Sequence, residues 1–153
     1  MSCELDHTDP SVLARQRWMQ VLARSGQALS EHDQRLRDCQ HYFIRPAQTG
    51  MAMVRGAAGG QGAAFNLGEM TVSRCVVQLH DGRQGFSYVA GRDLRHAELA
   101  ALADARLQGP EHDHWQQTLI EPLLAEQQRV RNERHARSLA TQVDFVTMVR
   151  GED

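Results

Sequence analysis

The chain is 153 residues long, which predicts a single domain over residues 1–153 with a frayed segment at 1–9. Hydrophobic residues make up 41% and charged residues 24%, and a net charge of −2 is not that of a nucleic-acid-binding domain. The polar, acidic first ten residues do not resemble a signal peptide, and the apolar runs are too short for a membrane helix. We therefore expect no nucleic-acid partner and no membrane partner.

Three cysteines are spread along the chain, and their number is odd. This spacing predicts neither a disulfide framework nor a zinc cluster, and a reducing cytoplasm is the expected location. The eight histidines are also scattered without ligand spacing. We expect no metal and no cofactor in this chain.

Helical patterns begin the chain. Asp9 and Pro10 are typical of an N-cap and a first helical residue, and Gly26 is expected to end that helix. A pattern that resembles a capping box at Ser30 and Asp33 predicts a short polar helix to about residue 39.

The period then changes to that of strands. Asp81-Gly82 predicts a hairpin turn between the last two strands. Pro46 is expected to close the first strand. The expected strands cover residues 42–45, 51–55, 63–67 (weak), 70–79 and 85–90. The pattern predicts an antiparallel meander of four or five strands.

Helical spacing returns after Gly91, with an apolar stripe that ends at Gly109-Pro110. A further helix is expected from Pro110, kinked or divided at Pro122 and followed by a polar helical stretch over 125–139. Helices, then a meander, then helices predict an α+β fold, with the meander flanked by N-terminal and C-terminal helices.

The loop RGAAGGQG at 55–62 raises the question of a phosphate site. It lacks the Gly-Lys-Ser/Thr ending of a Walker A loop, and Phe65 stands where the dinucleotide motif needs its third glycine. A strand rather than a helix is expected next, so no helix N-terminus would face an anion. We favour a flexible hairpin connection, and an independent nucleotide-binding protein or enzyme that uses Gly59–Gly62 remains the alternative.

A candidate polar surface consists of Arg92, Asp93, His96 and Arg134. Asp93 and His96 are three residues apart and could face one ligand, although an N-cap role for Asp93 is favoured. Arg134 belongs to an arginine run that is either a solvated face or a surface for a partner or a phosphate. No pattern identifies a catalytic residue.

The tail VDFVTMVRGED is rich in β-branched and apolar residues and predicts a strand. An apolar tail left free would be an exposed patch, so it either packs within this chain or enters a partner. We favour a partner for its outer part. The candidate interface residues are Phe145, Met148, Val149 and Arg150.

Five segments occur in an order that resembles the PhnG family of the bacterial carbon–phosphorus lyase system: RQRWMQVLARS, TGMAMVRGAAGGQGAAFNLGEMTVSRCVVQL, GFSYVAGRDLRHAELAALADA, LIEPL and VDFVTMVRGED. The resemblance covers about residues 14–153 and is weakest over 107–117. The combination of GRD before a histidine-containing helix with the ending DFVTMVRG carries most of its specificity.

The resemblance implies a non-catalytic or co-catalytic subunit, inactive alone, of α-D-ribose 1-methylphosphonate 5-triphosphate synthase. The family acts with PhnH, PhnI and PhnL to displace adenine from ATP with a methylphosphonate or another alkylphosphonate. PhnI is the expected closest partner, PhnH and PhnJ belong to the same core complex, and PhnL is a transient partner. The resemblance carries over no catalytic residue.

Overall fold

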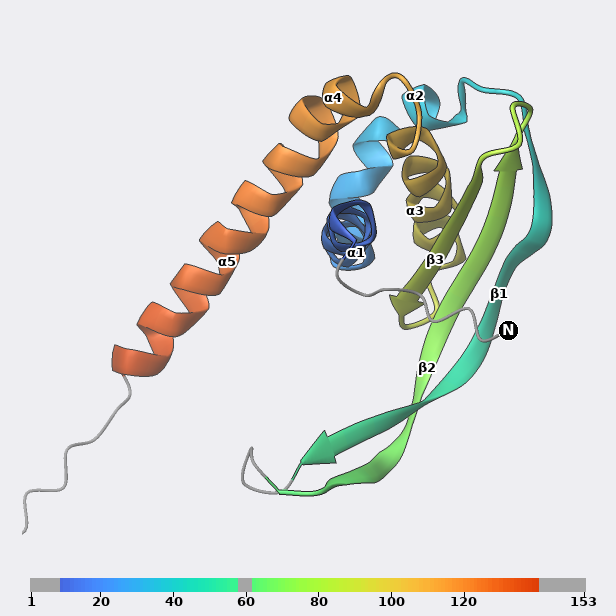
Figure 1. Ribbon diagram of the computed structural model, residues 1–153. Helices are drawn as coiled ribbons and strands as arrows, with labels where there is room; N and C mark the ends of the chain where they lie inside the picture. Colours follow the sequence, from blue (N-terminus) through green and yellow to red (C-terminus); the bar gives the residue numbers. More distant parts are fainter. Residues whose placement is uncertain (1–8, 58–61, 141–153) are drawn as a thin grey trace, which may run out of the picture.

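The computed structural model describes residues 9–57 and 62–140 (Figure 1). An N-terminal group of helices precedes a sheet, and a second group follows it. The elements are α1 (Pro10–Ala23), η1 (Gly26–His32), α2 (Asp33–Arg37), β1 (His41–Ala57), β2 (Ala64–Leu79), β3 (Gln84–Ala90), α3 (Leu94–Leu107), α4 (His112–Trp115), η3 (Gln116–Ile120) and α5 (Glu121–Ala140). This order confirms the predicted α+β class.

The sheet is antiparallel and has three strands in the order β1-β2-β3. The prediction of four or five strands is wrong because β1 continues through Pro46 and β2 continues through residues 68–69, so that each is one long strand. Pro46 is tolerated because β1 is an edge strand; one register shift precedes it, between Phe43 and Arg45, and a second spans it, between Arg45 and Gln48. Ala57 pairs with Ala64 across the glycine loop, so the predicted hairpin connection is confirmed, although residues 58–61 lie outside the described part of the chain.

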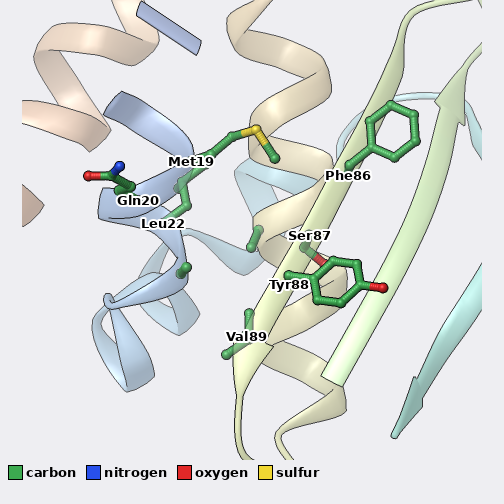
Figure 2. A pocket seen from close by; sticks show the side chains of 9 residues that line it. Met19, Gln20, Leu22, Phe86, Ser87, Tyr88 and Val89 are labelled. Atoms are coloured by element: carbon green, nitrogen blue, oxygen red, sulfur yellow. The ribbon is translucent and has the colours of Figure 1, made fainter. Parts of the chain in front are cut away.

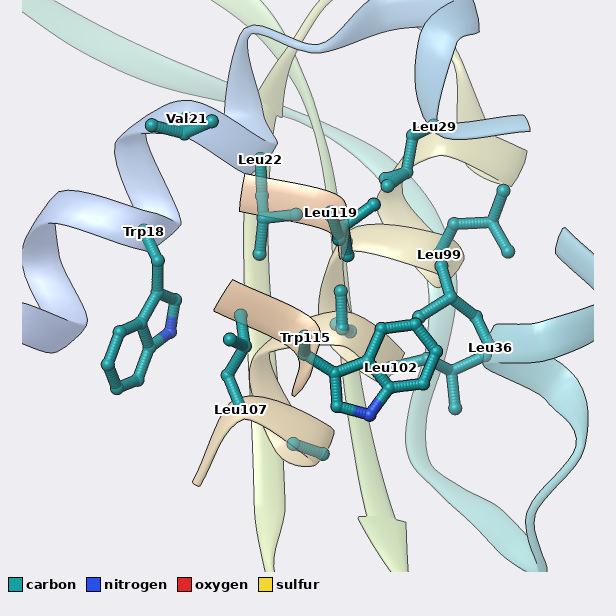
Figure 3. Close-up of a cluster of buried hydrophobic side chains, with 14 of the residues drawn as sticks. Trp18, Val21, Leu22, Leu29, Leu36, Leu99, Leu102, Leu107, Trp115 and Leu119 are labelled. Carbon is teal, nitrogen blue, oxygen red and sulfur yellow. The ribbon is translucent and has the colours of Figure 1, made fainter. Parts of the chain in front are cut away.

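Helix α3 packs on the inner face of the sheet and supplies more of the core than any other element (Figure 3). Its N-cap is Asp93, whose carboxylate accepts a hydrogen bond from the His96 backbone N–H at 2.9 Å, as predicted. Ser87 of β3 donates to the carbonyl of Ala97 at 2.6 Å, which joins the strand directly to the helix. The labelled core residues come from both helical groups: Trp18, Val21, Leu22, Leu29, Leu36, Leu99, Leu102, Leu107, Trp115 and Leu119.

The last helical stretch changes its winding before Pro122. Residues 116–120 form a π-helical segment, and Pro122 is the second residue of α5. A proline lacks the N–H that an interior helical position donates, so the wider turn before it accommodates the predicted division. Helix α5 then runs away from the body (Figure 1). No helix in the described ranges is long and apolar enough to cross a membrane.

Candidate interaction surface

The outer face of the sheet carries none of the described helices and exposes aromatic side chains along β3. Along β3, side chains alternate between the inner face, where Ser87 and Val89 are buried, and the outer face, where Phe86 and Tyr88 are 40% and 59% exposed. Figure 1 shows α1 and α3 on the other side of the sheet. One set of alternate β3 side chains therefore belongs to the core, and the other set is exposed on the outer face.

Arg74 is the polar centre of this outer face. Its guanidinium passes over Gly50, at 3.8 Å from the position a Cβ would take there, and its Nη1 donates to the Tyr88 hydroxyl at 3.5 Å. The Gln48 side-chain amide, oriented with its oxygen toward Arg74, accepts hydrogen bonds from the Arg74 Nε and Nη2 at 3.1 and 3.2 Å. No carboxylate among the described residues pairs with Arg74, so a positive charge with neutral partners lies beside the Tyr88 phenol.

The far half of the β1–β2 hairpin forms an arm that extends beyond the body (Figure 1). It exposes several large apolar side chains, and Met51 and Leu67 are 65% and 66% exposed. Methionine side chains adapt their shape to a partner surface. A soluble monomer seldom keeps so large an apolar patch, which marks an interaction site. The arm residues are Met51, Met53, Phe65, Leu67 and Met70.

A buried carboxylate locks the sheet to the first helix. Asp104 of α3 has a fully buried side chain that accepts from Arg15 at 2.7 and 3.2 Å and from the Trp18 indole N–H at 2.9 Å. It also accepts from the backbone N–H of Phe86 at 3.0 Å. Sequence reasoning missed Asp104, although one acid within the alanine-rich stripe of α3 was the available signal.

His96 does not lie on the predicted polar surface. It is 5% exposed, and its Nε2 lies 2.7 Å from the carbonyl of Leu22 and 3.1 Å from the Ser25 hydroxyl. The prediction of a surface role for His96 is wrong because its ring ties α3 to the end of α1. Arg92 and Asp93 are exposed in the turn and cap before α3.

The arginine run on α5 divides into paired and unpaired residues. Arg129 pairs with Glu126 and Glu133, and hydrogen bonding to Glu126 raises the Arg129 pKa further above its ordinary value. Arg131 and Arg134 have no carboxylate partner among the described residues. Together with Arg24, the C-cap residue of α1, they line one depression beside the end of that helix. Arg134 thus lies beside α1, and a surface role for it stays a prediction.

The cysteines among the described residues, Cys39 and Cys75, are free thiols, and Cys75 is inaccessible to reagents in solvent. Cys75 is buried. Its burial, and to a smaller extent the negative charge of the nearby Glu98, raise its pKa to about 11. Such a thiol stays protonated near neutral pH and is a poor nucleophile. No group of three or more His, Cys, Asp or Glu side chains within residues 9–57 and 62–138 is placed to hold a metal ion.

The predicted interface residues Phe145, Met148, Val149 and Arg150 lie outside the described part of the chain. The candidate interaction surface therefore consists of the outer sheet face and the hairpin arm, which the sequence did not identify.

The chain matches known proteins over almost its whole length. A family model described as phosphonate metabolism protein PhnG matches residues 13–151. The α-D-ribose 1-methylphosphonate 5-triphosphate synthase subunit PhnG of Rhizobium meliloti (strain 1021) is 44% identical over 110 residues. The matched region covers 72% of this chain and 70% of that relative.

Proposed function

The chain belongs to the PhnG family of phosphonate metabolism proteins, and we propose that it acts as a subunit of α-D-ribose 1-methylphosphonate 5-triphosphate synthase. The relative from Rhizobium meliloti is named as that subunit. One observation carries the proposal: the hairpin arm exposes several large apolar side chains, Met51, Met53, Phe65, Leu67 and Met70. Such a surface is stable in solution when a partner covers it.

The family resemblance supplies the partners. It implies that PhnI contacts this chain, that PhnH and PhnJ share its core complex and that PhnL joins transiently. It also implies the reaction, in which a phosphonate displaces adenine from ATP. We propose that this chain works in the cytoplasm, positions its partners and supplies no catalytic residue of its own.

A charge placed on the hairpin arm is expected to weaken assembly. Leu67→Glu puts a carboxylate where we propose an apolar contact, and the expected loss of affinity for PhnI is at least about tenfold. The measurement is the dissociation constant of the purified pair, together with the melting temperature of the free variant. Because the Leu67 side chain is 66% exposed, the melting temperature of the variant should stay close to that of the unsubstituted chain.

Asn66→Glu is the matched control, since it adds the same charge at the neighbouring residue, and adjacent strand residues point to opposite faces. Its affinity is expected to change much less. Equal binding by both variants would contradict a role for this face of the arm.

The alternative of an independent nucleotide-binding protein is tested on the isolated chain. Calorimetry with MgATP is expected to show no binding at micromolar concentration, because the chain after the glycine loop continues into strand β2 and not into a helix whose N-terminus would bind the phosphates. Elemental analysis of the same sample should find no stoichiometric zinc or iron. Micromolar MgATP affinity would favour the alternative, and a bound metal would contradict the proposal of a subunit without a cofactor.

A further inference from the structure

The free edge of β3 presents alternate backbone groups to solvent. The Gly91 N–H donates to the backbone carbonyl of Thr71 at 2.9 Å, and the Leu79 N–H donates to the backbone carbonyl of Arg83 at the same distance. Together with the β2–β3 register, these bonds show that residues 85, 87 and 89 bond to β2 through their backbone. The backbone groups of residues 84, 86, 88 and 90 therefore point away from the sheet.

The first half of this edge is already occupied. Phe86 N–H donates to the Asp104 carboxylate, as described above. The carbonyl of Gln84 accepts from the Arg15 guanidinium at 3.2 Å and from the Gln108 side chain at 2.8 Å. Side chains from α1 and from the end of α3 thus take the place of a neighbouring strand.

The second half of the edge is open. No partner within the described ranges bonds to the carbonyl of Phe86, to the N–H and carbonyl of Tyr88, or to the N–H of Ala90. This order of acceptor, donor, acceptor and donor is the pattern that an added β-strand satisfies. A helix or a compact ligand would leave part of it unpaired.

An apolar cavity lies along the open half. It measures about 220 Å³, and Figure 2 shows residues of α1 on one side and of β3 on the other. Ser87 is already bonded to Ala97 and the Tyr88 hydroxyl accepts from Arg74, so Gln20 is the remaining polar side chain of the lining. Phe86 and Tyr88 line the cavity and also belong to the exposed outer face, which makes the two surfaces continuous. The other lining residues are Met19, Leu22, Ala23, Val89 and Ala100.

The opposite edge of the sheet lacks these features. Pro46 lies in β1, and register shifts between Phe43 and Arg45 and between Arg45 and Gln48 interrupt its pairing. Proline and bulges are common means of protecting an edge strand from further pairing. The open half of β3 has neither a proline nor a register shift against β2.

We propose that an extended segment of another synthase subunit adds to the sheet beside Phe86–Ala90 as a fourth strand. Its backbone bonds to Tyr88 and Ala90, and one of its apolar side chains enters the cavity between α1 and β3. This inference rests on the proposed function, because it takes the added strand from a subunit of the same complex.

Residue-resolved amide hydrogen exchange tests the inference on the full-length chain, free and in the assembled synthase. The Tyr88 and Ala90 amides should exchange rapidly in the free chain and at least about tenfold more slowly in the complex. The Ser87 and Val89 amides face β2 and should be slow in both states, which provides an internal control.

Three results would overturn the inference. Tyr88 and Ala90 could remain unprotected in a complex that forms normally. They could be protected already in the free chain and stay so. They could also lose protection in the free chain when residues 144–153 are deleted, which would identify this chain's own tail as the added strand. If no complex forms at all, the proposed function itself fails.

A pair of variants at position 88 separates the contribution of the backbone to partner binding from that of the side chain. Tyr88→Pro and Tyr88→Ala both remove the phenol, but only the proline removes the outward N–H, and it leaves the bonds to β2 in place. Relative to the alanine variant, the proline variant should bind the partner subunits about tenfold more weakly. Equal affinity with both variants folded would overturn the proposed backbone pairing.

Discussion

Replacing Gly85 by alanine is expected to destabilise the fold by at least about 3 kcal/mol. A Cβ on Gly85 would lie 1.9 Å from the carbonyl oxygen of Ala101 and 2.8 Å from the backbone nitrogen of Ala105. Both contacts are with helix backbone, which no rotamer change can move. The methyl group can fit only if α3 moves away from β3, and that movement separates the helix from the core of the domain.

Urea denaturation of the Gly85→Ala chain and of the unsubstituted chain measures this loss of stability as a lower transition midpoint for the variant. Gly50→Ala is the matched control, because its Cβ would meet the Arg74 side chain at an ordinary 3.8 Å. We expect the control to change the free energy of unfolding by no more than about 0.5 kcal/mol. A Gly85→Ala chain as stable as the Gly50→Ala chain would refute the close approach of α3 to β3.

Asp104→Ala is expected to cost about 3 kcal/mol of stability, because it removes the acceptor of several buried donors at once. The indole N–H of Trp18 and the backbone N–H of Phe86 would each lose a partner, at 2.9 and 3.0 Å respectively. Arg15 is partly exposed and can turn to water, so it adds less to the loss.

Thermal and urea unfolding of the purified variant provide the measurement. Asp81→Ala serves as the control, since Asp81 forms an exposed ion pair with Arg83 and its removal should change stability little. If the two variants unfold alike, Asp104 does not tie α1, α3 and β3 together. The same substitution frees the Phe86 N–H, so it also extends the open part of the β3 edge.

The sequence predicted the helices and the last strand well because their signals are local. Asp9 and Pro10 begin α1 as expected, with the Asp9 carboxylate accepting from the Ser11 N–H at 2.8 Å. Asp93 begins α3, and the expected strand over 85–90 differs from β3 by one residue at its start. Capping and alternation depend on neighbouring residues, which a sequence displays directly.

The number of strands was mispredicted because it depends on tertiary context. Pro46 breaks a central strand but is compatible with an edge strand, and the order of strands cannot be read from composition. His96 was misplaced for a related reason. A polar residue in the first turn of a helix is usually solvated, whereas here the end of α1 covers the ring and supplies its hydrogen-bond partners.

The candidate surface was the least predictable part. Alternating apolar residues in a strand normally indicate a face buried in the same chain, and the sequence of the hairpin arm gives no sign that its apolar side chains stay exposed. Helix packing decides which face is covered: α3 covers the inner face near β3 and leaves the far part of the hairpin without cover. Only the three-dimensional arrangement distinguishes that arm from core.

Reconstitution of the synthase with and without this chain tests the central claim most directly. Purified PhnH, PhnI and PhnL would be incubated with ATP and methylphosphonate, and release of adenine together with formation of the ribose 1-phosphonate 5-triphosphate would be followed. We expect product when this chain is added, none when it is omitted and none from this chain alone. Product at the same rate without it, or product from this chain by itself, would contradict its role as a required subunit that is inactive alone.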